Sequence, residues 1–356
     1  MIDDLPKLLL LLPALLVFAC SSPDGGTGTQ KHVVLIQGAG KLGGCGIGEL
    51  DERSSGPEIA TVGSDGRVHV CRQEDGGWTA EVVDEVPGEQ IQLALGPVGP
   101  KGLAALVSVG VEQGGEDDGG SGIAWMLWRE QGLWQRRVLL RDSALLHAAA
   151  VGDVDSGAPG NEVVLAGFTR RVHLVTLGLA GPESRVIGSL PGNAKGLALG
   201  LGGILVACDD GSLVRFERPG KGSQGETWNS EVLVRHEQPL ARLSAVDDRA
   251  LYCGNDGVLR LWRAGASAEL YRSSDRLRGA VFVGEGRNDR GNAWAFASAG
   301  YDHTVRLHSE PPSPTNMTAL ADTDKLHHLA AGEIDGEPVL VSCGYSGNLV
   351  LTRPFQ

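Results

Sequence analysis

Histidine is the residue type in this sequence that most directly suggests a chemical role. The chain contains nine histidines, and an imidazole can act as a general acid, a general base or a metal ligand near neutral pH. His147 and His327 each open an apolar segment, HAAAVGDVD and HHLAAGEID. No GxSxG, HExxH or Walker motif accompanies them. The sequence therefore supports a binding protein better than an enzyme, and it predicts no cofactor.

Two further histidines occupy matching places in the segments RVHV and RVHL. His69 and His173 stand there where Arg260 and Arg306 stand in other, similar segments. Apolar and polar residues alternate in these segments, as they do in a β-strand with one face in the core. We therefore expect both imidazoles on the solvent-exposed face.

The cysteines give no sign of a metal site. The chain has six, and those that follow Cys20 are Cys45, Cys71, Cys208, Cys253 and Cys343. An odd number in an exported chain leaves at least one thiol free, and no CxxC or Cys/His spacing typical of zinc is present. Three of them end apolar segments, LVAC, LYC and LVSC. We expect free, buried thiols.

The start of the chain is predicted to export and anchor the protein. Residues 8–18 form an apolar run, which as a helix would span only about 16 Å, roughly half of a bilayer core. The run ends in VFAC, and the polar stretch SSPDGGTGTQ follows. This pattern resembles a bacterial lipoprotein signal peptide, in which cleavage before a cysteine precedes its lipidation. It implies a signal peptide over residues 1–20, lipidation of Cys20 and a flexible tether over residues 21–30. The alternatives are an ordinary signal peptide and a buried helix.

Lipidation of Cys20 would hold the protein on a membrane of the bacterial cell envelope, facing the periplasm or the exterior. More than one acyl chain gives stable anchoring, because each buried CH₂ adds about 0.8 kcal/mol. Nucleic acid is excluded as an expected partner, since the net charge is −13 and no basic stripe is present to neutralise phosphates.

Composition favours an all-β protein. The chain has 53 glycines and almost no runs of helix-forming residues with a period of 3.6, which is typical of short strands joined by tight turns. Six segments share one plan, an apolar strand, a polar or glycine turn and an alternating strand. The residues that mark their turns are Asp65, Thr169, Asp210, Asp256, Asp302 and Ser346.

A seventh hairpin is formed by GLAALVSVG and GIAWMLWRE, with a long acidic turn between them. An apolar strand precedes each hairpin, and a fourth strand follows the first six. Seven four-stranded units of about 40–50 residues predict a seven-bladed β-propeller over residues 31–356. The last unit lacks its outer strand, and HVVLI, residues 32–36, is predicted to supply it and close the ring. The alternative is a loose N-terminal strand.

Two propeller families resemble parts of the chain. The segments GNDGVLRLW, residues 254–262, and GYDHTVRL resemble WD-repeat propellers, although the Trp-Asp and Gly-His pairs of that family are missing. The segments VGDVDSGAPGNEVVLAG, GIGELDERSSGPEIATVG and AGEIDGEPVLVSCG resemble FG-GAP or VCBS-type repeats of exported proteins. Both resemblances imply a propeller, and neither implies one activity, because propellers host many unrelated functions.

The FG-GAP resemblance also implies a possible Ca²⁺ loop. Asp153, Asp155 and Asn161 match some of its ligand positions, but Ser156 and Gly157 interrupt the acidic series. Ca²⁺ takes six to eight oxygen ligands, so we prefer the interpretation that these residues only form a turn. The sequence predicts no metal site.

In a propeller, the starts of the inner strands and the hairpin turns meet at the mouth of the central channel. The candidate binding residues there are His147, Phe168, Arg170, Arg278, Tyr301, His303, His327 and Tyr345. Aromatic rings and cations supply contact area and directed hydrogen bonds, and the alternative is that these are solvated loop residues. We expect a protein-binding or scaffolding module. A carbohydrate- or small-ligand-binding propeller is second, and a hydrolase or lyase acting at the mouth is third.

Overall fold

The computed structural model describes residues 32–51, 54, 56–75, 77–99, 101–112, 120–155, 158, 160–178, 180–217, 228–287, 293–309 and 317–355. The predicted signal peptide, Cys20 and the tether lie outside these residues. Lys31–Gln356 forms one compact unit. No helix in the described ranges is long and apolar enough to cross a membrane.

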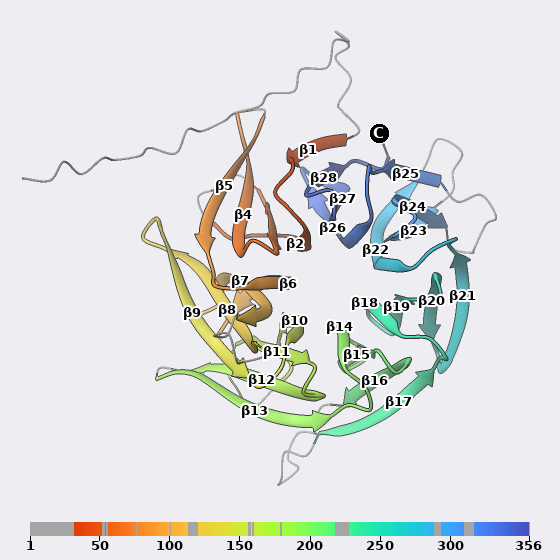
Figure 1. Ribbon diagram of the computed structural model, residues 1–356, viewed down its shortest axis with the longest axis horizontal. Coiled ribbons are helices and arrows are strands. Elements are labelled where there is room, and N and C mark those ends of the chain that lie inside the picture. The colour runs from red at the N-terminus through yellow and green to blue at the C-terminus, as the bar shows by residue number, and fades with distance from the viewer. Residues whose placement is uncertain are drawn as a thin grey trace, which may run out of the picture. The chain divides into compact units, whose positions relative to one another are not determined.

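The described strands form seven antiparallel four-stranded sheets. Figure 1 shows these sheets as blades arranged around a common axis. The inner strands of successive blades contact one another, and those of the last and first blades also do so. The prediction of an all-β, seven-bladed propeller is therefore confirmed.

Each blade has one strand at each of four positions, counted outward from the axis. The innermost strands are β2 (Leu42–Gly48), β6 (Glu89–Val98), β10 (Leu146–Gly152), β14 (Ala194–Gly200), β18 (Leu240–Val246), β22 (Leu277–Arg287) and β26 (Leu326–Ile334). The second strands are β3 (Glu58–Gly63), β7 (Leu103–Glu112), β11 (Glu162–Gly167), β15 (Gly203–Cys208), β19 (Arg249–Gly254), β23 (Ala293–Gly300) and β27 (Glu337–Gly344).

The outer half of each blade completes the sheet. The third strands are β4 (Arg67–Glu74), β8 (Ser121–Glu130), β12 (Arg171–Gly178), β16 (Ser212–Glu217), β20 (Val258–Arg263), β24 (Thr304–Ser309) and β28 (Leu349–Thr352). The outermost strands are β5 (Gly77–Glu85), β9 (Leu133–Asp142), β13 (Gly181–Ser189), β17 (Asn229–Arg235), β21 (Ala266–Arg272), β25 (Met317–Ala321) and β1 (His32–Ile36).

The ring closes by pairing the two ends of the unit. Strand β1 is antiparallel to β28, with His32 opposite Thr352 and Val33 opposite Leu351. The His32 imidazole and the Thr352 hydroxyl also lie 3.2 Å apart. Strand β1 covers an edge of the last blade that would otherwise be unpaired. The prediction that HVVLI completes the seventh blade is confirmed.

The hydrophobic core is divided among the interfaces between blades. The described residues contain seven clusters of buried side chains, and each joins residues of two neighbouring blades, including the last and the first. Burying a Val or Leu side chain contributes about 1.5–3 kcal/mol, so each blade depends on both neighbours. The five described cysteines are buried and free, as predicted.

The expectation for His69 and His173 is wrong. Both are buried, at 8% and 7% exposure. Alternation along a strand gives a solvent-exposed face only where one face of the sheet is open, and neighbouring blades cover both faces here. His173 lies against the Asp142 carboxylate, with 3.2 Å between Nε2 and Oδ2.

Every inner strand has a β-bulge near its start, where two residues oppose one residue of the second strand. In each bulge, one residue of the inner strand has no direct partner on the second strand. These residues form a set that we call the mouth ring, comprising Gly43, Ile91, His147, Lys195, Ala241, Arg278 and His327. The next residues form the inner ring, comprising Gly44, Gln92, Ala148, Gly196, Arg242, Gly279 and His328.

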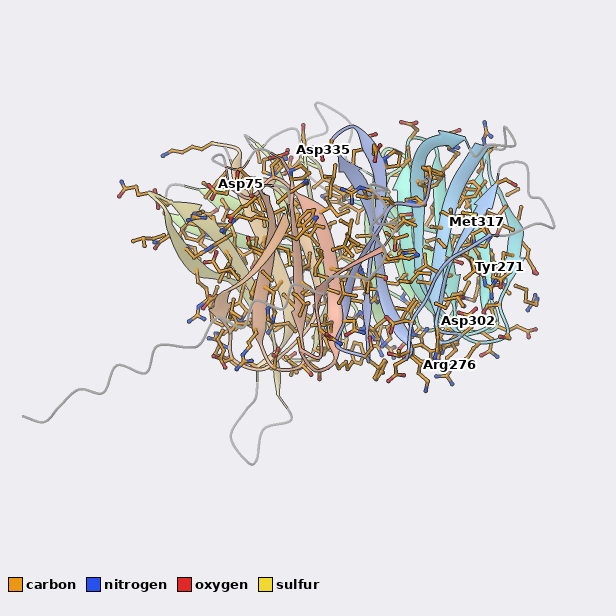
Figure 2. All side chains as sticks on the ribbon, turned by 90° about the horizontal axis from the view of Figure 1, so that it is seen from above. Asp75, Tyr271, Arg276, Asp302, Met317 and Asp335 are labelled. Carbon is orange, nitrogen blue, oxygen red and sulfur yellow. The ribbon has the colours of Figure 1, made fainter. Side chains whose placement is uncertain are left out.

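The bulges lie at one face of the propeller, which we call the mouth face. The turns between second and third strands lie at the same face, since the Tyr301 amide donates to the carbonyl of Arg276, next to the start of β22. Figure 2 shows Asp302 and Arg276 toward one edge of the unit, and Asp75 and Asp335 toward the other. Loops of one face therefore converge on the channel mouth.

Candidate ligand site at the channel mouth

A cavity of about 370 Å³ lies at the mouth face. Its lining includes four of the predicted residues, which are His147, Arg278, Tyr301 and His327. Three of these four belong to the mouth ring, and Tyr301 comes from the turn after β23. Because the bulge turns consecutive residues of each inner strand toward the axis, these side chains converge although they come from three blades.

Phe168 and Tyr345 lie beside the lining residues. The Phe168 ring stacks on the imidazole of His147, with 6.0 Å between ring centroids. Tyr345 packs edge-to-face against Tyr301 and against His327, each at 5.9 Å. Such aromatic pairs add about 0.5–1.5 kcal/mol beyond burial. Six of the eight predicted residues therefore line the cavity or pack against a residue that does.

Arg170 and His303 do not line the cavity. Both occupy a turn position with positive φ, 58° for Arg170 and 64° for His303. The equivalent residues of other blades are glycines, including Gly211 at 85° and Gly257 at 70°. This left-handed conformation costs a non-glycine residue about 1–2 kcal/mol. The turns that contain Arg170 and His303 are therefore less favourable than the turns that have glycine at this position.

Two further cations, Lys195 and Arg242, line the cavity and were not predicted from the sequence. The Lys195 ammonium lies 4.1 Å from the centroid of the Phe168 ring. The predicted residue Arg278 places its guanidinium 4.9 Å from the Tyr301 ring and donates to the Asn255 side-chain oxygen at 2.7 Å. Cation–π contacts of this kind contribute about 0.5–2 kcal/mol. The Asp209 carboxylate partly offsets the Lys195 charge and raises the pKa of Lys195 against the effect of burial.

Arg242 is the most buried of these cations, at 5% exposure. Its Nη1 donates to the carbonyl of Lys195 at 2.7 Å and to that of Ala241 at 3.2 Å. Burial, with the neighbouring Arg278 guanidinium as the next cause, lowers the pKa of Arg242 to about 10. The group therefore remains charged at neutral pH. Burial likewise lowers the pKa of Lys195.

The three histidines of the channel are neutral at pH 7. Burial lowers the pKa of His327 to about 3, with the Arg242 charge as the next cause. Burial, followed by Arg242, also lowers the pKa values of His147 and His328 well below their usual value. The His327 Nδ1 donates to the carbonyl of Gly43 at 3.1 Å, which fixes its tautomer. The cationic character of the site therefore comes from lysine and arginine.

Two of the candidate calcium residues interact with other protein groups, near the end of β10 that lies away from the mouth face. Asp155 forms an ion pair with Arg185 at 2.5 Å, and the Asn161 amide donates to the carbonyl of Pro97 at 3.0 Å. Asp153 is exposed. Across the described part of the chain, no group of three or more His, Cys, Asp or Glu residues is placed to hold a metal ion.

A buried glutamate organises this loop. The carboxylate of Glu162 accepts hydrogen bonds from the amides of Val154 and Asp155 at 3.0 and 2.9 Å. In the first blade, Glu58 accepts from the Leu50 amide at 2.8 Å with the same sequence spacing. Glu162 and Glu58, which lie in segments that resemble FG-GAP repeats, thus support the loop backbone in two blades.

Comparisons with known proteins show the fold and do not show a family. No protein-family model matches the sequence, and no curated protein matches it. Among solved structures, the WD40 β-propeller domain of Doa1 is similar, with a TM-score of 0.64 and 13% sequence identity over 91% of this chain and 98% of that chain. At this identity the similarity establishes the propeller architecture alone.

Proposed function

We propose that this propeller is a binding module that captures a partner protein at the channel mouth. The observation that carries the proposal is the cluster of cations and aromatic rings around the mouth cavity. Tyrosine and arginine dominate the energetics of protein interfaces because they combine contact area with directed polar groups. Rigid blades would hold this cluster in place before a partner arrives, which lowers the entropic cost of binding.

The size of the cavity suggests how the partner engages. A volume of about 370 Å³ admits a side chain or the end of an extended chain, and it excludes a folded domain. Tyr345 is 40% exposed beside the cavity, and Lys325 is exposed with its ammonium 5.3 Å from the Tyr301 ring. The partner would insert one group and contact this rim with the surface around it.

A second candidate is a small-molecule or carbohydrate ligand without a protein partner. It is favoured by the convergence of polar groups and aromatic rings on one concave site, which is typical of ligand pockets. The two candidates share the site and differ in how much of the rim they need.

Replacing Tyr301 and Tyr345 with alanine tests the site. The double variant is expected to lose at least about tenfold in affinity for a protein captured from the source cell's envelope and then purified. Tyr271→Ala is the control, since it also removes an aromatic ring with a nearby arginine, Arg306 at 5.8 Å, but on the outermost strand β21. Equal affinity of the double variant and the wild type would place the binding surface elsewhere.

We also propose that the protein is exported and lipid-anchored to the bacterial envelope through Cys20, on the basis of the sequence pattern around that residue. Cys20→Ser is expected to move the protein from the membrane fraction to the soluble fraction. Membrane association that persists in the variant would contradict the lipid anchor and would leave the binding proposal untouched.

A further inference from the structure

Arg242 has a guanidinium edge with no protein partner. Its Nη1 makes both of its hydrogen bonds, whereas Nε and Nη2 are buried and have no partner among the described residues. These two nitrogens form the side of the guanidinium that donates two parallel hydrogen bonds to an oxyanion. An isolated charge costs several kcal/mol to bury, so a counter-charge at this edge would be strongly stabilising.

No described carboxylate forms an ion pair with Arg242, and Asp209, the acid in the cavity lining, acts on Lys195. The one acidic residue in the lining of the mouth cavity is Asp209, and its two oxygens accept from the amide and the side chain of Asn193, each at 2.8 Å. Lys195 and Arg278 form no ion pair within the described ranges and lie against aromatic rings. Three cations thus surround one cavity in a chain whose net charge is −13.

The inner ring consists mostly of small residues. Four of its seven members are glycine or alanine, and strands β14 and β18 pack closely there, since a Cβ at Gly196 would lie 3.1 Å from the Cα of Arg242. A second cavity of about 390 Å³ lies farther along the channel. Arg242 lines both cavities. Arg242 therefore stands at the junction of the polar mouth and a channel lined mostly by apolar residues.

His328 offers one further donor at this level. Its Nδ1 lies 3.4 Å from the backbone amide of Cys45, and an amide can only donate. Nδ1 therefore accepts, and the hydrogen of the neutral imidazole is on Nε2. His328 lines the same channel cavity as Arg242, so its Nε2–H is available to an acceptor that enters there.

We propose that the channel mouth binds an oxyanion, a carboxylate or phosphate group, on the Nε–Nη2 edge of Arg242, with Lys195 and Arg278 as flanking cations. The inference rests on the proposed function, because it names the group that the partner or ligand inserts into the mouth. The oxyanion comes either from a free small acid or from the end of a protein chain. Both sources present the same planar or tetrahedral oxygens to the guanidinium.

Titration calorimetry with the purified full-length chain tests the proposal, using inorganic phosphate and acetate as probes. At least one probe should bind, with an affinity that falls as salt is added. Arg242→Met should lower that affinity at least about tenfold. Arg242→Lys should lower it less, because it keeps the charge and loses the two-point geometry. The control is Arg215→Met, which removes an arginine that pairs with Glu231 on the outer part of a blade.

Thermal denaturation of each variant separates loss of binding from loss of folding. No binding of either probe to the folded wild-type chain would overturn the proposal, and so would equal affinities of folded wild type and Arg242→Met. If the double Tyr301 and Tyr345 variant still loses its partner in that case, the proposed function stands and only the oxyanion inference fails.

A pair of peptides distinguishes the sources. A peptide with a free terminal carboxylate, competing with phosphate and binding more tightly than its amidated form, would support the end of a protein chain. Binding of free phosphate or acetate with no difference between the two peptides would support a small acid. Both results depend on Arg242 if the proposal holds.

Discussion

Arginines on the third strands and arginines at the channel mouth have different surroundings. Arg72 on β4 pairs with Glu81 at 2.8 Å, and Arg260 on β20 pairs with Asp256 at 2.5 Å. Arg242 and Arg278 at the mouth have no acidic partner in the part of the chain that the structure describes. The paired arginines of the third strands therefore stabilise the blade, whereas the positive charge of Arg242 and Arg278 at the mouth has no acidic partner among the described residues and can attract an anionic ligand. Substitutions in both regions can test this difference.

Breaking one third-strand pair should destabilise the fold. Asp256→Ala is expected to lower the free energy of unfolding by about 3 kcal/mol, because it leaves the mostly buried Arg260 without its counter-charge. Asp65→Ala is a matched control, because Asp65 and Asp256 each accept a hydrogen bond from a turn amide at 3.1 Å. The arginine that pairs with Asp65 is Arg67, whose side chain is half-exposed and whose Nε lies 4.0 Å from the Asp65 carboxylate. Chemical denaturation measures both, and equal losses would contradict the role of the ion pair.

Removing the unpaired cation Arg242 at the mouth should instead raise the free energy of unfolding. Arg242→Met is expected to raise the free energy of unfolding by about 1–2 kcal/mol in a buffer without multivalent anions, because it removes a buried charge that no acid compensates. Arg260→Met should lower it, since the carboxylate of Asp256 then loses its partner. A loss of stability in both variants would show that the two regions do not differ.

Acidification should weaken the mouth more than the third strands. Burial and Arg242 lower the pKa of His327 to about 3, so the unfolded state binds more protons between that pH and about 6.5. The free energy of unfolding is therefore unaffected by the protonation of His327 above pH 6.5. Below pH 6.5 it decreases as the pH falls, by at most about 1.4 kcal/mol per pH unit. His327→Gln should flatten the dependence between pH 7 and 5.

His173→Gln is the comparison for that experiment. Burial lowers the pKa of His173 as well, but the Asp142 carboxylate opposes the shift, so this variant should change the slope less. Denaturation curves at a series of pH values measure both slopes. A larger change for His173→Gln would mean that the mouth cations do not set the protonation of the channel.

The smallest expected effect concerns the two turns without glycine. Arg170→Gly should raise the free energy of unfolding by about 0.5–1 kcal/mol, because its φ is 58° and glycine adopts this conformation without strain. Arg171→Gly, in the neighbouring strand, should instead lower it by a similar amount. Because Arg170 does not line the cavity, its replacement should leave phosphate and acetate affinity unchanged. A tenfold loss of affinity would restore Arg170 to the site.

The blade repeat could be predicted from the sequence because its signals are local. Polar or glycine turns recur between apolar segments, and six outer strands for seven hairpins required a strand from elsewhere, which HVVLI supplied. The mouth residues were predicted less completely. Six of the eight lie in or beside the lining of the mouth cavity, whereas Arg170 and His303 occupy the positive-φ position of their turns and do not line it.

Arg242 was missed because a bulge cannot be recognised from alternation. In the segment LARLSAV, a period of two places Arg242 on the same face as Leu240, yet the bulge between them changes the register. Lys195 occupies the bulge position equivalent to His147, Arg278 and His327, and it was missed because the apolar segment of its strand begins only at Gly196. His69 and His173 were misplaced because burial on both faces depends on neighbouring blades, which one strand's pattern does not reveal.

The pairing of β1 with β28 also bears on how the protein is made. The partners His32 and Thr352 are 320 residues apart, so β1 leaves the ribosome well before its partner β28 is made. Loop closure over that length costs only about 2 kcal/mol more than over one 40-residue unit, since the cost grows logarithmically, but it slows folding. An incomplete translation product would keep an open sheet edge and remain a substrate for proteases, so only finished chains would accumulate.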